Sequence, residues 1–218
     1  MKQGKLYTIA IIFLTICAFI ISITDKPEDN NRQNTILFLG DSLTYNYKLN
    51  EFFEEYKTFN SGISGNKTTD ILNDLENRVY KYNSTKVFLL IGINDLKAGI
   101  SNDEVLNNIE IIIKKIKENS KETIIYVESL YPISDEKDKK NIKKIVPKTD
   151  NNEIKETNKK LNELCKKYNI KYINVYDKLL NDKGSLKKDY TTDGLHLNDL
   201  GYFKVTKVLE KYVSEKES

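Results

Sequence analysis

The chain has 218 residues, a length that suits one domain whose core is large enough to fold without disulfide bonds. Charged residues make up 31% of the sequence and hydrophobic residues 39%, as in an ordinary soluble globular domain. The net charge is only +3 and the lysines are mixed with acidic residues, which argues against a nucleic-acid partner.

The N-terminal segment differs from the rest, because Leu6–Thr24 carries no charge and follows Lys2 and Lys5. At about 1.5 Å per helical residue, this run nearly spans a hydrocarbon core of roughly 30 Å. Residues 1–24 are therefore interpreted as an uncleaved signal anchor or as a cleaved signal peptide. We favour the anchor, since the run is long for a signal peptide and lacks a good cleavage site. Either alternative predicts export of the remainder, with the basic residues on the inner side of the membrane.

Residues 25–34 are polar and predict a linker, whereas strands and helices alternate through residues 35–218. The predicted strands cover 35–39, 57–60, 87–91, 123–130 and 171–175. The predicted helices cover a short stretch within 45–55, then 68–82, a segment after Ser101, 154–168 and 198–213. About five strands alternating with helices predict an α/β domain with a mostly parallel sheet covered on both faces, in flavodoxin-like order.

One stretch breaks this alternation. Residues 131–152 are rich in Lys and Asp and contain two prolines, which predicts a long surface loop at the end of a strand. Long loops in that position often serve a binding site. We expect this loop, with Tyr45 and Tyr47, to shape a substrate pocket.

The first predicted strand is apolar from Ile36 to Leu39 and breaks abruptly into Gly40-Asp41-Ser42. A core strand that ends in this way places a hydroxyl at the carboxyl edge of the sheet, where open α/β folds bind their ligands. Ser42 is therefore a candidate nucleophile, although a serine in this position can also simply cap a helix.

Histidine occurs once in the sequence, as His196, so no other residue can supply an imidazole base for Ser42. Asp193 lies three residues upstream, and a turn at Gly194 would let its carboxylate fold back onto the ring and fix the tautomer. A lone histidine at a helix start is more often structural. Its pairing with Asp193 and with a serine at a strand edge favours the catalytic interpretation.

Acyl transfer also needs hydrogen-bond donors for an oxyanion, and two loops offer them. Gly62 follows the second strand and could present its backbone N–H without a Cβ in the way. Asn94 follows the third strand and carries a side-chain amide. With the N–H of Ser42, these make three donors at strand ends; the alternative is that Gly62 is a turn residue and Asn94 a cap.

The ordered set resembles the GDSL or SGNH hydrolase family over residues 36–198. Its blocks I, II, III and V are similar to Gly40-Asp41-Ser42-Leu43, Gly62, Gly92-Ile93-Asn94-Asp95 and Asp193-Gly194-Leu195-His196. The resemblance implies a three-layer α/β/α sandwich and serine esterase chemistry without metal or cofactor. It implies a triad of Ser42, Asp193 and His196, and an oxyanion hole of Ser42, Gly62 and Asn94. The surrounding residues are most similar to the lysophospholipase-like or platelet-activating-factor acetylhydrolase-like branch.

The function predicted from the sequence is an exported carboxylic ester hydrolase that works through an acyl-enzyme intermediate. Its expected partners are an ester substrate and, through residues 1–24, the membrane. Two substrate classes stay open: O-acetylated glycans of a wall or capsule, and lysophospholipids or other short-chain lipid esters. Asp41 and Asp95 are interpreted as structural residues that bind backbone N–H groups.

Other classes of protein fit the sequence less well. A metal-dependent phosphoesterase usually needs several histidines or a dense carboxylate cluster. A nucleotide-binding domain would need a G-x-G-x-x-G or P-loop motif, and the sequence has neither. A non-catalytic glycan-binding module stays as an alternative from outside the enzymes, disfavoured by the complete set of motifs.

Overall fold

The structure is a computed structural model that describes residues 34–134 and 149–215, all within one compact unit. The predicted signal segment (1–24), nearly all of the predicted linker (25–34) and most of the predicted 131–152 loop lie outside the described residues. Among the helices in the described ranges, none combines the length and apolar character needed to cross a membrane.

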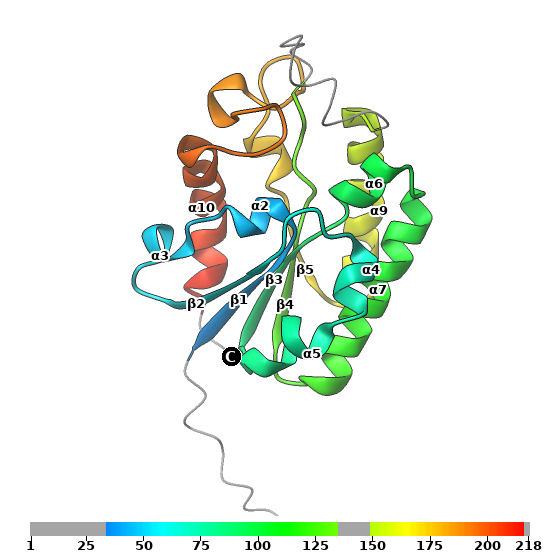
Figure 1. Ribbon diagram of the computed structural model, residues 1–218, viewed down its shortest axis with the longest axis vertical. Coiled ribbons are helices and arrows are strands. Elements are labelled where there is room, and N and C mark those ends of the chain that lie inside the picture. The colour runs from blue at the N-terminus through cyan, green and yellow to red at the C-terminus, as the bar shows by residue number, and fades with distance from the viewer. Residues whose placement is uncertain (1–33, 135–148, 216–218) are drawn as a thin grey trace, which may run out of the picture. The chain divides into compact units, whose positions relative to one another are not determined.

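A parallel sheet of five strands forms the centre of the described unit (Figure 1). The strands are β1 (Thr35–Gly40), β2 (Lys57–Gly62), β3 (Lys86–Leu90), β4 (Ile124–Glu128) and β5 (Lys171–Ile173). Their spatial order is β2-β1-β3-β4-β5, and every neighbouring pair is parallel. The predicted flavodoxin-like order is thus confirmed, and all five carboxyl ends lie at one edge of the sheet.

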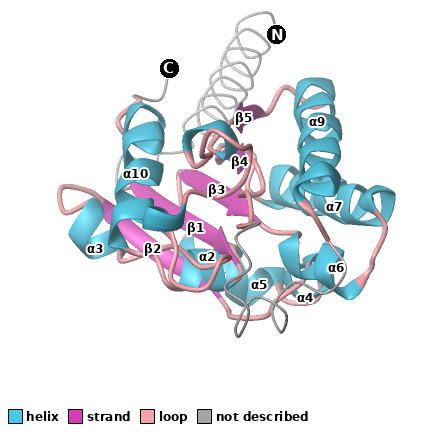
Figure 2. Cartoon of the chain, turned by 90° about the horizontal axis from the view of Figure 1, so that it is seen from above, coloured by secondary structure: helices cyan, strands magenta, loops and turns pink. Residues whose placement is uncertain are grey.

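Helices cover both faces of the sheet and make a three-layer α/β/α sandwich (Figures 1 and 2). One face carries α3 (Leu49–Phe52) and α10 (Asp199–Val213). The other carries α4 (Thr68–Leu72), α5 (Leu75–Arg78), α7 (Asn102–Asn119) and α9 (Asn151–Lys167). Two short helices, α2 (Ser42–Tyr45) and α6 (Ile93–Ala98), begin directly beyond the carboxyl ends of β1 and β3.

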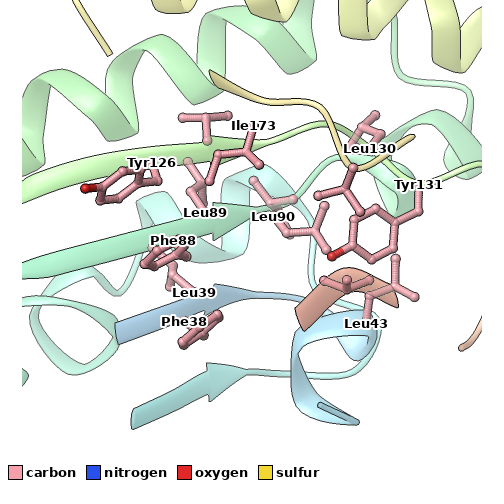
Figure 3. Close-up of a cluster of buried hydrophobic side chains, with 14 of the residues drawn as sticks. Phe38, Leu39, Leu43, Phe88, Leu89, Leu90, Tyr126, Leu130, Tyr131 and Ile173 are labelled. Carbon is pink, nitrogen blue, oxygen red and sulfur yellow. The ribbon is translucent and has the colours of Figure 1, made fainter. Parts of the chain in front are cut away.

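Stacked aromatic rings fix the register of the three central strands (Figure 3). Phe38 on β1 stacks on Phe88 of β3 with ring centroids 4.9 Å apart, and Phe88 stacks on Tyr126 of β4 at 4.7 Å. The strand pairing places these residues directly opposite one another. Such pairs add about 0.5–1.5 kcal/mol beyond their buried area. The stack therefore holds in place the strands whose ends carry Ser42 and Asn94.

The prediction of one continuous helix over residues 68–82 is wrong. It is divided into α4, α5 and a 3₁₀ turn over Tyr80–Tyr82. Asn73 and Asp74 lie at the first break, and both residue types favour caps and turns over helix interiors. The break redirects the chain so that Arg78, the last residue of α5, is buried rather than exposed.

Two other predicted boundaries change because of capping side chains. Asp41 caps α2, so an additional helix begins at Ser42 itself, whereas α3 (Leu49–Phe52) lies within 45–55, where the sequence predicts a short helix. Asp150 accepts hydrogen bonds from the amides of Asn152 and Glu153, so α9 begins at Asn151 and the predicted 131–152 loop is shorter. Its first four residues, 131–134, are buried rather than part of a surface loop.

Candidate active site

Ser42 lies where β1 passes directly into α2. The Asp41 carboxylate accepts a hydrogen bond from the Leu43 amide at 2.9 Å and starts the helix at Ser42. Gly40 has no space for a Cβ, because that atom would lie 2.2 Å from the Thr44 hydroxyl and 2.3 Å from a β3 carbonyl. The turn is therefore tight, and the amide of Ser42, in the first turn of α2, has no intrahelical acceptor.

His196 and Asp193 reach Ser42 from the loop before α10. The Ser42 Oγ and the His196 Nε2 are 2.9 Å apart, and the His196 Nδ1 lies 2.6 Å from the Asp193 Oδ2. The other Asp193 oxygen accepts the backbone amides of His196 at 2.8 Å and of Leu195 at 3.0 Å. Gly194 allows this reversal because its φ is +90°. The three predicted residues thus form one continuous hydrogen-bonded path.

The charge of Asp193 fixes the tautomer of the His196 ring. Partial burial raises the pKa of Asp193, but hydrogen bonds from the His196 ring and from the His196 and Leu195 amides outweigh it, so the pKa lies below its usual value. An ionised Asp193 accepts the Nδ1 hydrogen. The Nε2 lone pair is then directed at the Ser42 hydroxyl, as a general base requires.

The histidine loop is held by further hydrogen bonds. The Thr191 hydroxyl donates to the His196 carbonyl at 2.7 Å and accepts the Gly194 amide at 2.9 Å. The Gly194 carbonyl accepts the Ser134 amide at 2.8 Å, which joins this loop to the segment after β4. The position of the imidazole is therefore set by the backbone of two loops, not by the Asp193 side chain alone.

Helix α10 supports both sides of the site. The Tyr202 hydroxyl donates to the Leu43 carbonyl in α2 at 2.7 Å, and the Tyr47 and Thr206 hydroxyls are 2.6 Å apart. The same helix begins just after His196, at Asp199. The nucleophile helix and the histidine loop therefore rest on one common element.

Asn94 lies in the first turn of α6, beyond the end of β3. Its side-chain NH₂ donates to the Asn66 carbonyl at 2.9 Å, and the Lys97 ammonium lies 3.5 Å from its amide oxygen. These two contacts fix which end of the amide is the donor. The NH₂ group has a second hydrogen, which leaves it one donor for a substrate.

Gly62 is the last residue of β2 and pairs with Gly40 of β1. Its N–H donates to the Asn60 side-chain oxygen at 2.9 Å. A Cβ at this position would lie 2.2 Å from the Tyr45 backbone nitrogen, so the close approach of α2 requires glycine here. We expected glycine here because the lack of a Cβ would let a substrate approach the backbone N–H. The structure adds a second reason, the contact with α2. The Gly62 N–H also already has an acceptor in Asn60.

The two tyrosines expected at the pocket differ in position. Tyr45 is 61% exposed beside Ser42, whereas Tyr47 is only 5% exposed. The Tyr47 ring stacks on Tyr202 with centroids 4.8 Å apart. Tyr47 therefore belongs to the core, and the expectation that it shapes the pocket is wrong.

The acids interpreted as structural do bind backbone amides. Asp95 accepts the Thr68 amide at 3.1 Å and the Thr68 hydroxyl at 2.6 Å, and burial raises its pKa. Burial raises the pKa of Asp41 to about 7, and its second oxygen is buried with no hydrogen-bond partner among the described residues. The sequence pattern did not single out Glu128, which accepts the Tyr131 hydroxyl at 2.6 Å and whose pKa burial also raises to about 7.

Comparison with known proteins identifies the family. Residues 38–203 match the family described as GDSL-like lipase/acylhydrolase. The chain belongs to that family. The matched range begins within β1 and ends within α10, so it contains Ser42, Gly62, Asn94 and the histidine loop.

Solved structures share the fold of this chain. A Streptococcus pneumonia protein named as a platelet activating factor is 31% identical, with a TM-score of 0.77 over 94% of this chain and 99% of that one. A GDSL-like lipase from Bacteroides thetaiotaomicron is 20% identical, with a TM-score of 0.69 over 90% and 94% of the two chains. An acetyl xylan esterase is 21% identical, with a TM-score of 0.68 over 82% and 99%.

Curated relatives are longer proteins. The N-acylneuraminate cytidylyltransferase of Streptococcus agalactiae serotype III is 29% identical over 174 residues, which are 78% of this chain and 37% of that protein. The chain therefore spans well under half of the length of this relative. The cytidylyltransferase activity in the relative's name belongs to the whole longer protein.

Proposed function

We propose that the chain hydrolyses acyl or acetyl esters with Ser42 as nucleophile, His196 as general base and Asp193 as the acid that orients the ring. One observation carries this proposal: the unbroken path from the Asp193 Oδ2 through both ring nitrogens to the Ser42 Oγ, with steps of 2.6 and 2.9 Å. The family supports the same class of reaction, because its members are lipases and acylhydrolases.

In the proposed mechanism, His196 takes the hydroxyl proton as the Ser42 Oγ attacks the ester carbonyl carbon. The tetrahedral intermediate collapses when His196 returns the proton to the leaving alcohol, which leaves an acyl group on Ser42. A water molecule, deprotonated by the same ring, then attacks the acyl carbon and releases the acid. Asp193 stabilises the imidazolium in both halves of the reaction.

The proposed oxyanion donors are the Ser42 N–H, the free hydrogen of the Asn94 NH₂ and the Gly62 N–H. The first two are supported by the absence of an intrahelical acceptor at Ser42 and by the fixed orientation of the Asn94 amide. The Gly62 N–H would have to share its hydrogen between Asn60 and the oxyanion, since it already donates to Asn60.

Two substrate classes stay in competition. The acetyl xylan esterase among the similar structures supports an acetylated glycan, and the pneumococcal protein named as a platelet activating factor supports a lipid ester. A panel of p-nitrophenyl esters from acetyl to long-chain acyl, measured beside O-acetylated glycans, separates them. Strong preference for acetyl would support the glycan substrate, and preference for long chains would support the lipid substrate.

A fluorophosphonate probe tests the chemistry independently of the substrate. It should label the wild-type protein and fail to label Ser42→Ala, which removes only the attacking hydroxyl. Failure to label the folded wild-type protein would refute the serine mechanism. Hydrolysis that persists unchanged with a chelator present is the expected result for a reaction without metal.

We also propose that residues 1–24 export the domain and hold it at the membrane. The support is the charge-free run Leu6–Thr24 behind Lys2 and Lys5. Protease added to intact cells should then degrade the tagged full-length protein, while a variant that lacks residues 1–24 should be protected. Protection of the full-length protein would refute export.

A further inference from the structure

Arg78 is buried directly behind the proposed oxyanion hole. It is 4% exposed at the end of α5, and four of its five N–H groups have acceptors. Its Nη2 donates to the Gly40 carbonyl at 2.9 Å and to the Ser61 carbonyl, its Nη1 to the Asn66 side-chain oxygen, and its Nε to the Ser61 hydroxyl at 3.1 Å. One guanidinium thus connects the ends of β1 and β2 with the loop after β2.

Each acceptor is next to one of the proposed donors. The Ser61 carbonyl belongs to the same planar peptide group as the Gly62 N–H, so fixing one fixes the direction of the other. Asn66 accepts Arg78 with its side chain and the Asn94 NH₂ with its backbone carbonyl at 2.9 Å. The Gly40 carbonyl lies two residues before Ser42.

The acceptors of Arg78 are all neutral. Within the described part of the chain, no carboxylate lies within ion-pair distance of its guanidinium, although burying a charge is costly. Basic residues elsewhere are almost all lysine, since arginine occurs only at positions 32 and 78. A lysine would offer three donors from a single nitrogen, whereas a guanidinium presents five donors on three nitrogens in a rigid fork.

We propose that Arg78 is a positioning residue of the oxyanion hole, which orients the Gly62 peptide and, through Asn66, the Asn94 amide. This inference rests on the proposed function, because it assigns a role to the donors named there. The hydrogen bonds that the Arg78 side chain donates go to Gly40, Ser61 and Asn66, and not to a residue of the proposed triad. Loss of Arg78 should therefore weaken stabilisation of the transition state and leave the hydrogen bonds between Ser42, His196 and Asp193 in place.

The first test measures kcat and KM for p-nitrophenyl acetate in Arg78→Met and Arg78→Lys. We expect kcat to fall about 10- to 100-fold in Arg78→Met, and less in Arg78→Lys, because a misplaced donor loses most of its effect. KM should stay within about twofold, and the acid limb of the pH profile should not move. Asn66→Ala, at a half-buried position, removes one acceptor without removing the charge and should lower kcat in the same way by a smaller factor.

Lys86→Met is the matched control, because Lys86 is the other buried cation among the described residues. It is fully buried at the amino end of β3, and its ammonium donates to the Tyr212 and Val213 carbonyls at 3.1 and 2.7 Å. This variant should lose stability by a similar mechanism and keep its kcat. If Lys86→Met and Arg78→Met lost kcat equally at equal loss of stability, the positioning role would be refuted.

A double-mutant cycle separates positioning from general damage. Since Arg78 acts partly through Asn94, the two losses should overlap, and the double variant Arg78→Met/Asn94→Ala should keep a higher kcat than the product of the two single losses predicts. In Lys86→Met/Asn94→Ala, the losses of the two single variants should simply multiply. Unchanged kcat in Arg78→Met would overturn the inference; if that variant does not fold, unchanged kcat in Asn66→Ala would do so. The proposed function would still stand in either case, provided that hydrolysis depended on Ser42. Absence of Ser42-dependent hydrolysis in the wild type would refute both.

Discussion

At the scale of single residues, the hydrogen bonds around His196 determine which ring nitrogen carries the proton. Asp193 uses one oxygen for the ring and the other for two backbone amides, so its carboxylate cannot rotate freely. The depressed pKa of Asp193 keeps it ionised through the neutral range. The geometry therefore already favours proton transfer from Ser42 before any substrate is present.

Replacing His196 by alanine should lower kcat/KM for p-nitrophenyl acetate by about 10⁴-fold or more, because no other imidazole exists in the chain. Asp193→Asn should lose about 10⁴-fold, since an asparagine NH₂ would favour the wrong ring tautomer. Circular dichroism checks that both variants fold. Retention of near wild-type rates in His196→Ala would contradict the triad.

Glu128 should make stability depend on pH. Burial raises its pKa from 4.5 to about 7, so the folded protein holds this proton more tightly than the unfolded chain does. Its contribution to stability is then fully present below about pH 4.5 and is lost as the pH rises through about 7. From pH 4 to 8, the unfolding free energy of Glu128→Gln relative to wild type should rise by on the order of 2–3 kcal/mol. Urea titrations at both pH values measure this difference; a constant difference would show that Glu128 does not titrate in this range.

At the scale of elements, the site depends on how closely α2 approaches the end of β2. Asn60 donates to the Thr44 carbonyl at 2.8 Å and the Tyr47 carbonyl at 3.1 Å, which draws the end of the short helix toward the strand. Only a glycine at position 62 permits this approach, because a Cβ would meet the helix backbone.

Gly62→Ala should therefore displace α2 and with it Ser42. We expect a loss of about 1–3 kcal/mol in stability and a marked fall in kcat. Gly184→Ala is a suitable control: Gly184 has a positive φ (+82°), so alanine is strained there, but the added Cβ would meet only the end of a flexible lysine side chain at 3.6 Å. The control should lose stability without losing kcat. Equal kcat in the two variants would argue against the packing explanation.

The sequence predicts the strands well and identifies Asp193 and His196 as candidate partners, because both depend on local patterns. Buried parallel strands are continuous apolar runs, and Asp193 is three residues from His196. The split of residues 68–82 and the role of Arg78 lack such patterns. Arg78 donates to backbone carbonyls of β1 and β2. Every residue has a backbone carbonyl, so the sequence does not indicate which of them will accept a hydrogen bond from a side chain. Tyr45 and Tyr47 differ in burial because α2 ends between them.

At the scale of the whole molecule, Ser42 and His196 are separated by 154 positions in the sequence and by one hydrogen bond in space. Ser42 follows β1, an inner strand that pairs on both sides, and His196 lies in the loop before α10. The fold of the whole domain therefore brings the two residues together. The stacked rings of Phe38, Phe88 and Tyr126 bind the same central strands together (Figure 3). The site is thus a property of the complete domain and not of any smaller fragment.

Activity and structure should therefore disappear together in urea. The midpoint for loss of p-nitrophenyl acetate hydrolysis should coincide with the midpoint by circular dichroism, as in a two-state transition. Phe88→Leu should move both midpoints to lower urea by the same amount and leave the kcat of the remaining folded protein unchanged. Inactivation at clearly lower urea than unfolding would show that the site opens locally.

The attachment of α2 and of the histidine loop to α10 has a kinetic consequence. Because Tyr202 joins α10 to α2 and the histidine loop leads directly into α10, no rearrangement is needed to bring Ser42 within reach of its base. Covalent inactivation by a small organophosphorus reagent should therefore proceed as a single exponential from the moment of mixing, without a lag, with a rate proportional to reagent concentration.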